Sequence, residues 1–345
     1  MIHFAIIGCG HIANKHIEAI KRLEQAELVA VCDANLTRLA QLQEELKVAC
    51  FTDLAEMLDH KPEIDVVCIC TPSGLHVQHA VAAARAGKHL IIEKPVALTL
   101  EDIDAIRDAA AVSQVKVTVV HPNRFRPAVQ RLKWALDRDW FGKLSHVNVT
   151  LRWNRNQAYY DQSPWRGTRA MDGGVLMNQA IHSLDLIQWL IGPVADVKAM
   201  IDTRIRQIES EDVAVATIRF ANGVLGVVEA STTIYDKNLE ESISVFGEHG
   251  FAVIGGPTAN WIKHLNCAGL TREEANEWIL KVEQNPFGIP GHQHIIEDMI
   301  AAIEEGREPI VTIEDGRNAV KLVLDICNDG LQQVTYQDLG GVAWS

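Results

Sequence analysis

The chain has 345 residues, of which 48% are hydrophobic and 22% charged, with a formal net charge of −13. This length favours two domains of ordinary globular composition, and the acidic balance argues against non-specific nucleic-acid binding. No apolar run approaches the ~20 residues of a membrane span, and the odd set of seven cysteines lacks a CxxC pair, so we predict a reduced, cytoplasmic protein.

Strand-like apolar runs alternate with amphipathic helical patterns in the first third of the chain. The expected strands are residues 3–8, 27–33, 64–71, 88–95 and 115–120. The expected helices between them are residues 16–23, 36–46, 75–87 and 100–113. Near-continuous apolar strands separated by helices are typical of a parallel sheet covered on both faces. We therefore predict an α/β protein with a doubly wound Rossmann domain over residues 1–120.

A glycine-rich turn, G-x-G-x-x-A, lies between the first expected strand and the first expected helix. Gly8 permits a tight turn, Gly10 leaves room for a pyrophosphate, and the small Ala13 lets the helix pack close to the strand. The helix N-terminus then offers N–H groups and a positive dipole end to the phosphates. This context predicts a dinucleotide site, although a Rossmann-like sheet with a glycine turn and no nucleotide stays an alternative.

An acidic residue ends the second expected strand. Asp33 lies about 20 residues after Ala13, where an acid binds the adenine ribose hydroxyls. The next residues, Ala34 and Asn35, offer no arginine for a 2′-phosphate. The sequence therefore favours NAD over NADP as the cofactor.

Polar loops follow the third and fourth expected strands, at Thr71–His76 and Glu93–Pro95. Ligands of open α/β sheets bind beyond the carboxyl ends of the strands. We therefore expect Lys94, mounted before the rigid Pro95, to face the nicotinamide half of the cofactor.

The pattern changes after residue 120. Strand candidates follow one another with few helices between them, which predicts an α+β domain with a large, mostly antiparallel, open-faced sheet. The strand candidates are residues 143–154, 194–203, 212–220, 223–233, 240–247 and 250–256, and the helix candidates are residues 127–142, 173–192, 292–306 and 316–331. We assign residues 121–345 to substrate binding and oligomerisation, with the open sheet face as the candidate interface of a homo-dimer or homo-tetramer.

The helix predicted over residues 173–192 carries two polar candidates. Asn178 and His182 stand four residues apart and so share a helix face. His182 on its own also fits a satisfied core histidine.

A loop rich in arginine and aromatic residues precedes that helix. Arg155 and Arg166 suit phosphate or carboxylate groups, and Tyr159 and Trp165 suit stacking, although a solvated loop is the alternative for each arginine. Arg152 and Arg169 add to the local positive charge.

His292, in a Gly-His turn at a helix start, is a further substrate-binding candidate. His292 and His294 are two residues apart and point away from each other on a helix, so we predict no metal site.

Four stretches together carry a family resemblance: the G-x-G-x-x-A turn, "CTPSGLHVQHAVAAARAGKHLIIEKPVALT", "HPNRFRP" and "GGVLMNQAIHSLDLIQWLIG". They resemble the glucose-fructose oxidoreductase / inositol dehydrogenase / MocA (Gfo/Idh/MocA) family along nearly the whole chain. The resemblance implies that Lys94 and His182 lie in the active site. It also implies a cofactor site lined by Gly8, Gly10, His11, Ile12, Asp33, Thr71, Pro72, Ser73, His76, Glu93, Lys94 and Asn123; our own addition from the arginine-rich loop is Trp165 and Arg166.

One position departs from many family members, which carry Asp where this chain has Asn178. An amide orients a hydroxyl but cannot accept its proton as a base. The stretch from Arg152 to Gly192 is similar to the branch that oxidises UDP-N-acetylglucosaminuronate at C3 in surface-polysaccharide pathways. We therefore expect an NAD-dependent sugar-nucleotide dehydrogenase. An inositol, polyol or free-sugar dehydrogenase is the first alternative, and a non-catalytic NAD-binding sensor is the second.

The expected proton acceptors are Lys94 and His182, alone or in relay, with Asn178 orienting the sugar. Burial or the positive nicotinamide would lower the pKa of Lys94 towards the working pH. Whether NADH stays bound and is recycled by a 2-oxo acid is left open.

Overall fold

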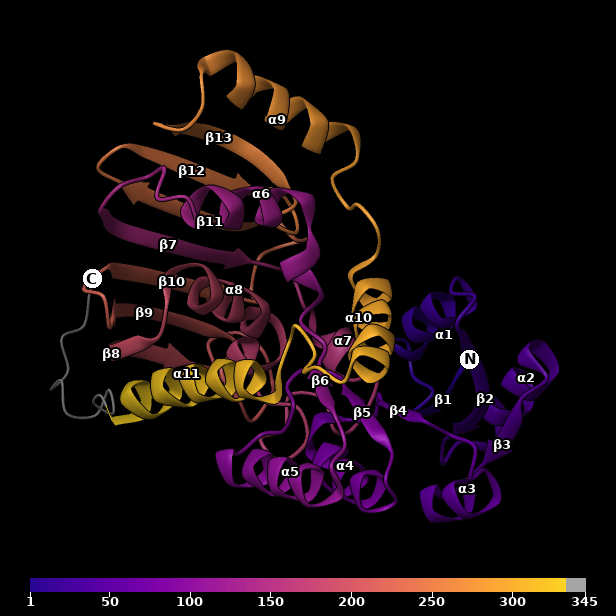
Figure 1. Ribbon diagram of the computed structural model, residues 1–345. Coiled ribbons are helices and arrows are strands. Elements are labelled where there is room, and N and C mark those ends of the chain that lie inside the picture. Colours follow the sequence, from indigo (N-terminus) through magenta and orange to yellow (C-terminus); the bar gives the residue numbers. More distant parts are fainter. Residues whose placement is uncertain (333–345) are drawn as a thin grey trace, which may run out of the picture. The chain divides into compact units, whose positions relative to one another are not determined.

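A computed structural model describes residues 1–332 of the chain (Figure 1). These residues divide into two compact units. Unit 1 comprises residues 1–130, 170–172 and 287–320, and unit 2 comprises residues 131–169, 173–286 and those from 321 onward. The predicted boundary between functional domains after residue 120 stays a prediction. The last 13 residues of the predicted second domain, 333–345, lie outside the described part of the chain.

Unit 1 is built on a six-stranded parallel sheet with strand order β3-β2-β1-β4-β5-β6. The strands are β1 (Ile2–Ile7), β2 (Ala26–Cys32), β3 (Ala49–Phe51), β4 (Val66–Ile69), β5 (His89–Ile92) and β6 (Val117–Val119). The order reverses direction beside β1, as in doubly wound folds, so the predicted Rossmann architecture is confirmed. Strand β3 was not predicted, because three residues are too few to show a periodic pattern.

The helices of unit 1 include α10 (Gly291–Glu305), which comes from a distant part of the sequence. They are α1 (Ala13–Lys21), α2 (Leu36–Leu46), α3 (Leu54–His60), the 3-10 turns η1 (Ser73–Leu75) and η2 (Pro122–Phe125), α4 (His76–Arg85), α5 (Leu100–Ser113) and α10 (Gly291–Glu305). Ile295, Ile296 and Met299 of α10 are buried in one core cluster with Phe4 and Ile20. This apolar packing explains why residues 287–320 group with unit 1 rather than with the segment that precedes them.

Local sequence signals account for several helix starts. The side chains of Asn35, Asp53 and Thr99 each accept a hydrogen bond from the backbone N–H three residues later, at the starts of α2, α3 and α5. Such caps stabilise a helix by ~1 kcal/mol. Two helices, α6 (Pro127–Leu136) and α11 (Ile313–Gln332), begin in unit 1 and end in unit 2.

Unit 2 contains a seven-stranded sheet with strand order β13-β12-β11-β7-β10-β9-β8. Its strands are β7 (Leu144–Arg152), β8 (Val194–Asp202), β9 (Val213–Phe220), β10 (Leu225–Ser231), β11 (Glu240–Gly247), β12 (Gly250–Gly255) and β13 (Trp261–Cys267). Only the β7–β10 pair is parallel, so the mostly antiparallel sheet is confirmed. The helical elements are α7 (Gln157–Tyr160), η3 (Leu176–Ala180), α8 (Ile181–Ile191) and α9 (Arg272–Gln284), of which α7 and α9 were not predicted.

The two faces of this sheet differ in burial. Alternate residues of β9 are buried and exposed, and the strand register places the exposed members on one face with those of the neighbouring strands. Large hydrophobic side chains exposed on that face are Met200, Val215, Leu225, Val227 and Phe251. An open apolar face is confirmed, and its use in association stays a prediction.

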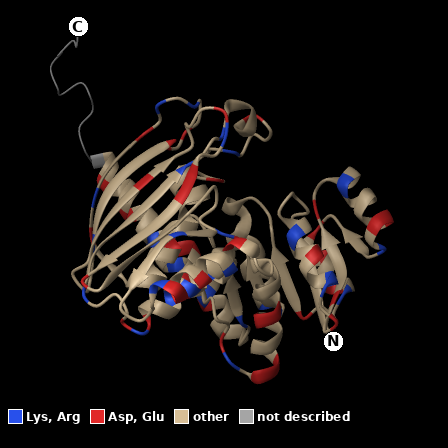
Figure 2. Cartoon of the chain, turned by 90° about the horizontal axis from the view of Figure 1, so that it is seen from above, with Lys and Arg blue, Asp and Glu red and all other residues tan. Residues whose placement is uncertain are grey.

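Charged residues of both signs are interspersed over the surface helices in the view of Figure 2. No helix within residues 1–332 is long and apolar enough to cross a membrane. The cysteines are all free thiols.

Candidate active site

The glycine-rich turn of unit 1 leaves space for a ligand at one glycine and none at the other. Gly8 has a φ of +85°, and a Cβ there would lie 2.5 Å from the backbone nitrogen of Thr71. A Cβ on Gly10 would meet only Nη1 of Arg38, at 3.8 Å. The chain thus requires glycine at position 8 for its own packing, while the space beside Gly10 is open for a pyrophosphate.

Helix α1 begins directly after this turn. Ile12 is its N-cap residue and supplies no side-chain hydrogen bond, and His11 is exposed beside it. The first N–H groups of α1 therefore lack a side-chain cap, which is the arrangement that binds phosphate in dinucleotide folds.

The predicted ribose-binding acid is held against the turn. Asp33 accepts hydrogen bonds from the backbone N–H of Cys9 at 2.7 Å and of Asn35 at 2.8 Å. Arg38, one turn into α2, donates from Nη1 to the Cys9 carbonyl at 2.6 Å. Arg38 was not predicted, because it lies beyond Ala34 and Asn35, the two residues after Asp33 on which the prediction was based.

His76 ties together the two loops at the carboxyl ends of β4 and β5. Its Nε2 lies 2.9 Å from the Thr71 carbonyl, and its Nδ1 lies 2.9 Å from the Pro95 carbonyl. Burial lowers the pKa of His76, and the two carbonyl acceptors act in the opposite direction. Pro72 lies between Thr71 and the buried Ser73 in the first of these loops. His76 therefore fixes the loops relative to each other, and its contact with the cofactor stays a prediction.

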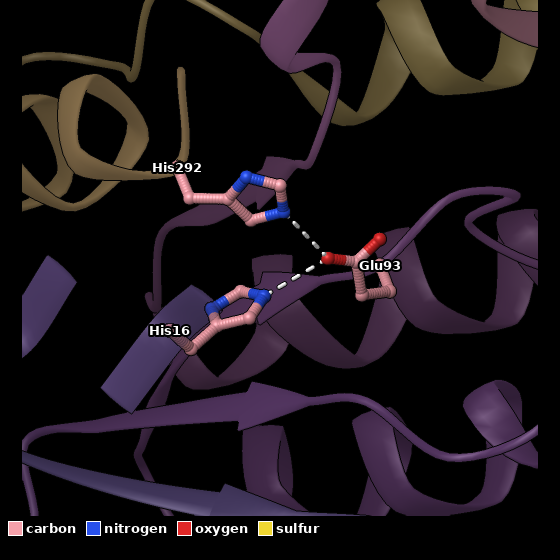
Figure 3. Close-up of side chains that lie close together, drawn as sticks. All are labelled: His16, Glu93 and His292. Atoms are coloured by element: carbon pink, nitrogen blue, oxygen red, sulfur yellow. Dashed lines mark hydrogen bonds and ion pairs between the residues drawn. The ribbon is translucent and has the colours of Figure 1, made fainter. Parts of the chain in front are cut away.

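Lys94 follows β5 and is half-buried, and the Lys94–Pro95 peptide bond is cis. The preceding Glu93 is buried with His16 of α1 and His292 of α10 (Figure 3). Sequence reasoning missed His16, although its place on the buried face of α1 was a usable signal. His292 lies against the Glu93 carboxylate, and its contact with substrate stays a prediction.

Asn123, another predicted cofactor residue, lies in η2 and is buried. It lines a cavity of about 330 Å³ in unit 1 together with Lys15, Arg126, Gly291 and His292.

In unit 2, Asn178 and His182 lie where a π-helical turn passes into α8. Residues 176–180 form the π turn η3, a feature often found at functional sites. Between residues 174 and 187, Asn178 and His182 are the only residues that are not fully buried. The prediction that they share a face agrees with this shared exposure, and their catalytic roles stay predictions.

A buried acid holds the start of this helical segment. Glu211 accepts a hydrogen bond from the Leu176 N–H at 2.9 Å, and a Cβ on Gly174 would lie 2.3 Å from the Glu211 carboxyl group. Burial raises the pKa of Glu211, and the Leu176 N–H opposes that rise. Gly174 therefore makes room for the capping acid of this segment.

The arginine-rich loop of unit 2 forms a stack in which guanidinium groups alternate with aromatic rings. Arg155 lies 5.0 Å from the ring centre of Trp153 and 5.2 Å from that of Tyr159. Arg166 lies 4.3 Å from the Tyr159 ring and 4.7 Å from the Trp165 ring, and its Nη1 donates to the Tyr159 hydroxyl at 2.6 Å. Arg166 also lines a cavity of about 590 Å³ in unit 2.

The other arginines of this loop are engaged elsewhere. Arg152 forms ion pairs with Glu229 at 2.6 Å and Glu240 at 3.2 Å, and Arg169 donates to the Glu209 carbonyl. Arg155 and Arg166, by contrast, have no carboxylate partner among residues 1–332. The loop thus contains two stacked cations with uncompensated charge in a protein of net charge −13.

Comparison with known proteins identifies the family of the chain. Residues 2–121 match the model of the Gfo/Idh/MocA oxidoreductase family with an NAD-binding Rossmann fold, and residues 129–253 match a C-terminal domain of the same family. The chain belongs to the Gfo/Idh/MocA family. It is accordingly an NAD-dependent sugar dehydrogenase, and the expected cofactor and enzyme class are confirmed.

Three Gfo/Idh/MocA relatives illustrate the range of similarity. The WlbA dehydrogenase of Bordetella pertussis, solved with NADH and UDP-GlcNAcA, is 34% identical with a TM-score of 0.91 over 96% of each chain. Myo-inositol 2-dehydrogenase of Thermotoga maritima is 28% identical over 93% of this chain and 94% of its own. UDP-N-acetylglucosamine 3-dehydrogenase of Acidithiobacillus ferrooxidans is 31% identical over 68% of this chain and 69% of its own.

Proposed function

We propose that the enzyme oxidises the C3 hydroxyl of a UDP-linked N-acetylated sugar, with UDP-N-acetylglucosaminuronate as the first candidate. The observation that carries the proposal is the stack in which Arg155 and Arg166 alternate with Trp153, Tyr159 and Trp165. A diphosphate needs cations, and a uracil ring needs flat surfaces. Inositol and free sugars need neither, so an uncompensated pair of stacked arginines favours a sugar nucleotide over a polyol.

Two further observations support this substrate class. The cavity beside Arg166 measures about 590 Å³, within the ~300–1,000 Å³ range of small-molecule sites. The relative crystallised with UDP-GlcNAcA is 34% identical to this chain and covers 96% of it. A role in polysaccharide biosynthesis stays a prediction.

The residues that would hold NAD fit that group. The open space at Gly10, the uncapped N-terminus of α1 and the Asp33 carboxylate suit its pyrophosphate and adenine ribose. Bound NAD supplies the hydride acceptor. Lys94 is proposed to take the proton of the reacting hydroxyl, alone or in relay with His182, while Asn178 orients the sugar by hydrogen bonding.

The test is NADH formation, followed by absorbance, with a panel of substrates. UDP-N-acetylglucosaminuronate should react, UDP-N-acetylglucosamine should react more weakly, and myo-inositol and glucose should be inert. The panel is repeated with a 2-oxo acid. If NADH remains bound, the 2-oxo acid would reoxidise it and so allow further turnover. Efficient oxidation of myo-inositol with no response to either nucleotide would refute the substrate class.

Replacing Arg155 sharpens this test. Arg155→Met should raise KM for the sugar nucleotide ~10- to 100-fold, since a charge-assisted hydrogen bond contributes ~1.5–3 kcal/mol. The Kd of NADH, measured by fluorescence on the same sample, should stay unchanged. An unaltered KM would mean that the stack is a structural feature of the loop.

A further inference from the structure

Unit 1 contains a buried cluster of three titratable side chains contributed by three separate elements. His16 comes from α1, Glu93 from the end of β5 and His292 from the first turn of α10 (Figure 3). Their exposed fractions are only 1%, 5% and 6%. Oε1 of Glu93 lies 2.9 Å from Nε2 of His16 and 3.2 Å from Nε2 of His292.

The carboxylate of Glu93 has donors on both of its oxygens. The two imidazoles occupy Oε1, and Oε2 accepts the backbone N–H of the next residue, Lys94, at 3.2 Å. Burial alone would raise the pKa of Glu93, but the hydrogen bonds from His16 and His292 outweigh it and hold that pKa well below the usual value. Glu93 is therefore an ionised carboxylate inside the protein.

The geometry also fixes how the histidines carry their protons. Each Nε2 faces the carboxylate and must bear a hydrogen to bond to it. Burial lowers the pKa of His292, so at neutral pH this ring is uncharged. Nδ1 of His16 is buried without a hydrogen-bond partner. Both rings thus donate from Nε2 to the Glu93 carboxylate.

Two histidines and a glutamate also form a common set of metal ligands, and these three lie close enough to hold an ion. Two features favour the hydrogen-bonded form. The nitrogen–oxygen distances are those of direct hydrogen bonds. Histidines that bind metals also normally donate their second N–H to an acceptor, and Nδ1 of His16 has none.

We propose that His16 and His292 are positioning residues that hold the Lys94 peptide in place through Glu93. The proposal rests on the catalytic role of Lys94 in the proposed function. The Glu93 N–H donates to the Ile69 carbonyl at 3.0 Å, which fixes one side of the segment to the sheet. On the other side, His76 Nδ1 reaches the Pro95 carbonyl at 2.9 Å. Between these anchors, the Lys94 N–H is held by the Glu93 carboxylate.

The burial of this carboxylate argues for a function. Burying an ionised carboxylate costs more free energy than packing an apolar residue into the same core. What the carboxylate provides is a fixed acceptor for one particular N–H group, that of Lys94. A displacement of about 1 Å in a reacting group can cost ~100-fold in rate, so a rigid mount for a proton acceptor has a direct catalytic value.

The test uses two substitutions that differ in reach. In Gln the amide nitrogen lies near the position of histidine Nε2, and in Asn it lies near Nδ1. His16→Gln and His292→Gln therefore keep a donor at Glu93, whereas His16→Asn and His292→Asn keep the polarity and lose the donor. We expect the Asn variants to lower kcat ~10- to 100-fold and the Gln variants to retain most of it, with the Kd of NADH and KM unchanged in both. His294→Asn, on the same helix and stacked on Phe125 outside the cluster, is the control.

Three results would overturn the proposal. The first is equal kcat in the Asn and Gln variants. The second is a loss of NADH binding and of Tm that accounts for the whole loss of rate, which indicates a structural role. The third is a stoichiometric metal ion in the purified enzyme, with kcat lost on chelation.

A Lys94→Ala background separates this proposal from the proposed function. If Lys94→Ala removes turnover and the Asn variants do not lower kcat, only the positioning role fails. If Lys94→Ala retains turnover, the role of Lys94 fails first. In that case an undiminished effect of His16→Asn in the Lys94→Ala background would show that the cluster acts elsewhere.

Discussion

Unit 1 holds its candidate functional groups through the backbone, whereas unit 2 holds them through side chains. In unit 1 the Gly8–Ile12 turn, the uncapped N-terminus of α1 and the Lys94 peptide are all main-chain features, and the last of them is held by the Glu93 carboxylate. In unit 2 the candidates are Asn178 and His182 on a helix and a stack of loop side chains. A cofactor shared by a whole family suits a backbone site, and a substrate that differs between members suits exchangeable side chains.

The two units also differ in how they treat charge. Unit 1 buries an ionised glutamate between two histidines, and unit 2 leaves Arg155 and Arg166 partly exposed and without acidic partners within residues 1–332. Charge in unit 1 therefore stabilises an arrangement within the protein, and charge in unit 2 remains available to a ligand. Substitutions in each unit test this difference in the role of charge.

The largest expected effect comes from Lys94. Lys94→Ala should lower kcat ~10²- to 10⁴-fold, the usual contribution of a general base, because the hydroxyl proton then has no acceptor at that position. Since the glycine-rich turn, the N-terminus of α1 and Asp33 are the groups proposed to hold the pyrophosphate and adenine ribose, the Kd of NADH should change less than about threefold. Stopped-flow turnover and NADH fluorescence on the same sample measure both. Loss of NADH binding together with turnover would make Lys94 a structural residue.

The second effect separates the two glycines of the turn. Gly10→Ala should leave Tm unchanged, because its Cβ meets only Arg38 at 3.8 Å, but should weaken NADH binding ~10-fold or more by occupying the pyrophosphate space. Gly8→Ala should lower the stability by ~1–3 kcal/mol, because its Cβ overlaps the Thr71 backbone and its φ is +85°. Thermal unfolding and NADH titration of both variants give the answer. Equal Tm losses in the two variants would contradict a ligand space at Gly10.

The same difference between the units decides what the sequence could predict. The glycine turn, Asp33 and Lys94 were predictable because their spacing reflects backbone geometry that is local in sequence. Asn178 and His182 needed the family resemblance, since a four-residue spacing is common on any helix. The His16–Glu93–His292 cluster was not predicted, because His292 lies 199 residues after Glu93 in the sequence. Only the packing of α10 into the core of unit 1 brings the two side chains together. The π turn at residues 176–180 has no periodic signature that distinguishes it from an ordinary helix.

The smallest expected effect concerns pH and the buried histidines of unit 1. In unit 1, burial lowers the pKa of His76, His89 and His292, and lowers that of His79 to about 4. In unit 2 the groups with a raised pKa include Glu211, Lys198, Arg152 and Cys267.

A histidine with a lowered folded-state pKa is protonated first in the unfolded chain. Its stabilising contribution is therefore complete above the unfolded value of ~6.5 and is lost as pH falls below it, by up to ~1.4 kcal/mol per pH unit for each such group. The folded-state pKa of Glu93 is lowered, so its stabilising contribution is lost only in more acidic solution, as the pH falls below ~4.3. We expect the Tm of the enzyme without cofactor to be flat from pH 8 to 7 and to fall from pH 6.5 to 5. His79→Gln, which removes one of these groups, should reduce that fall. A Tm that rises on acidification, or an unchanged slope in His79→Gln, would show that the buried histidines of unit 1 are not the groups that titrate on unfolding.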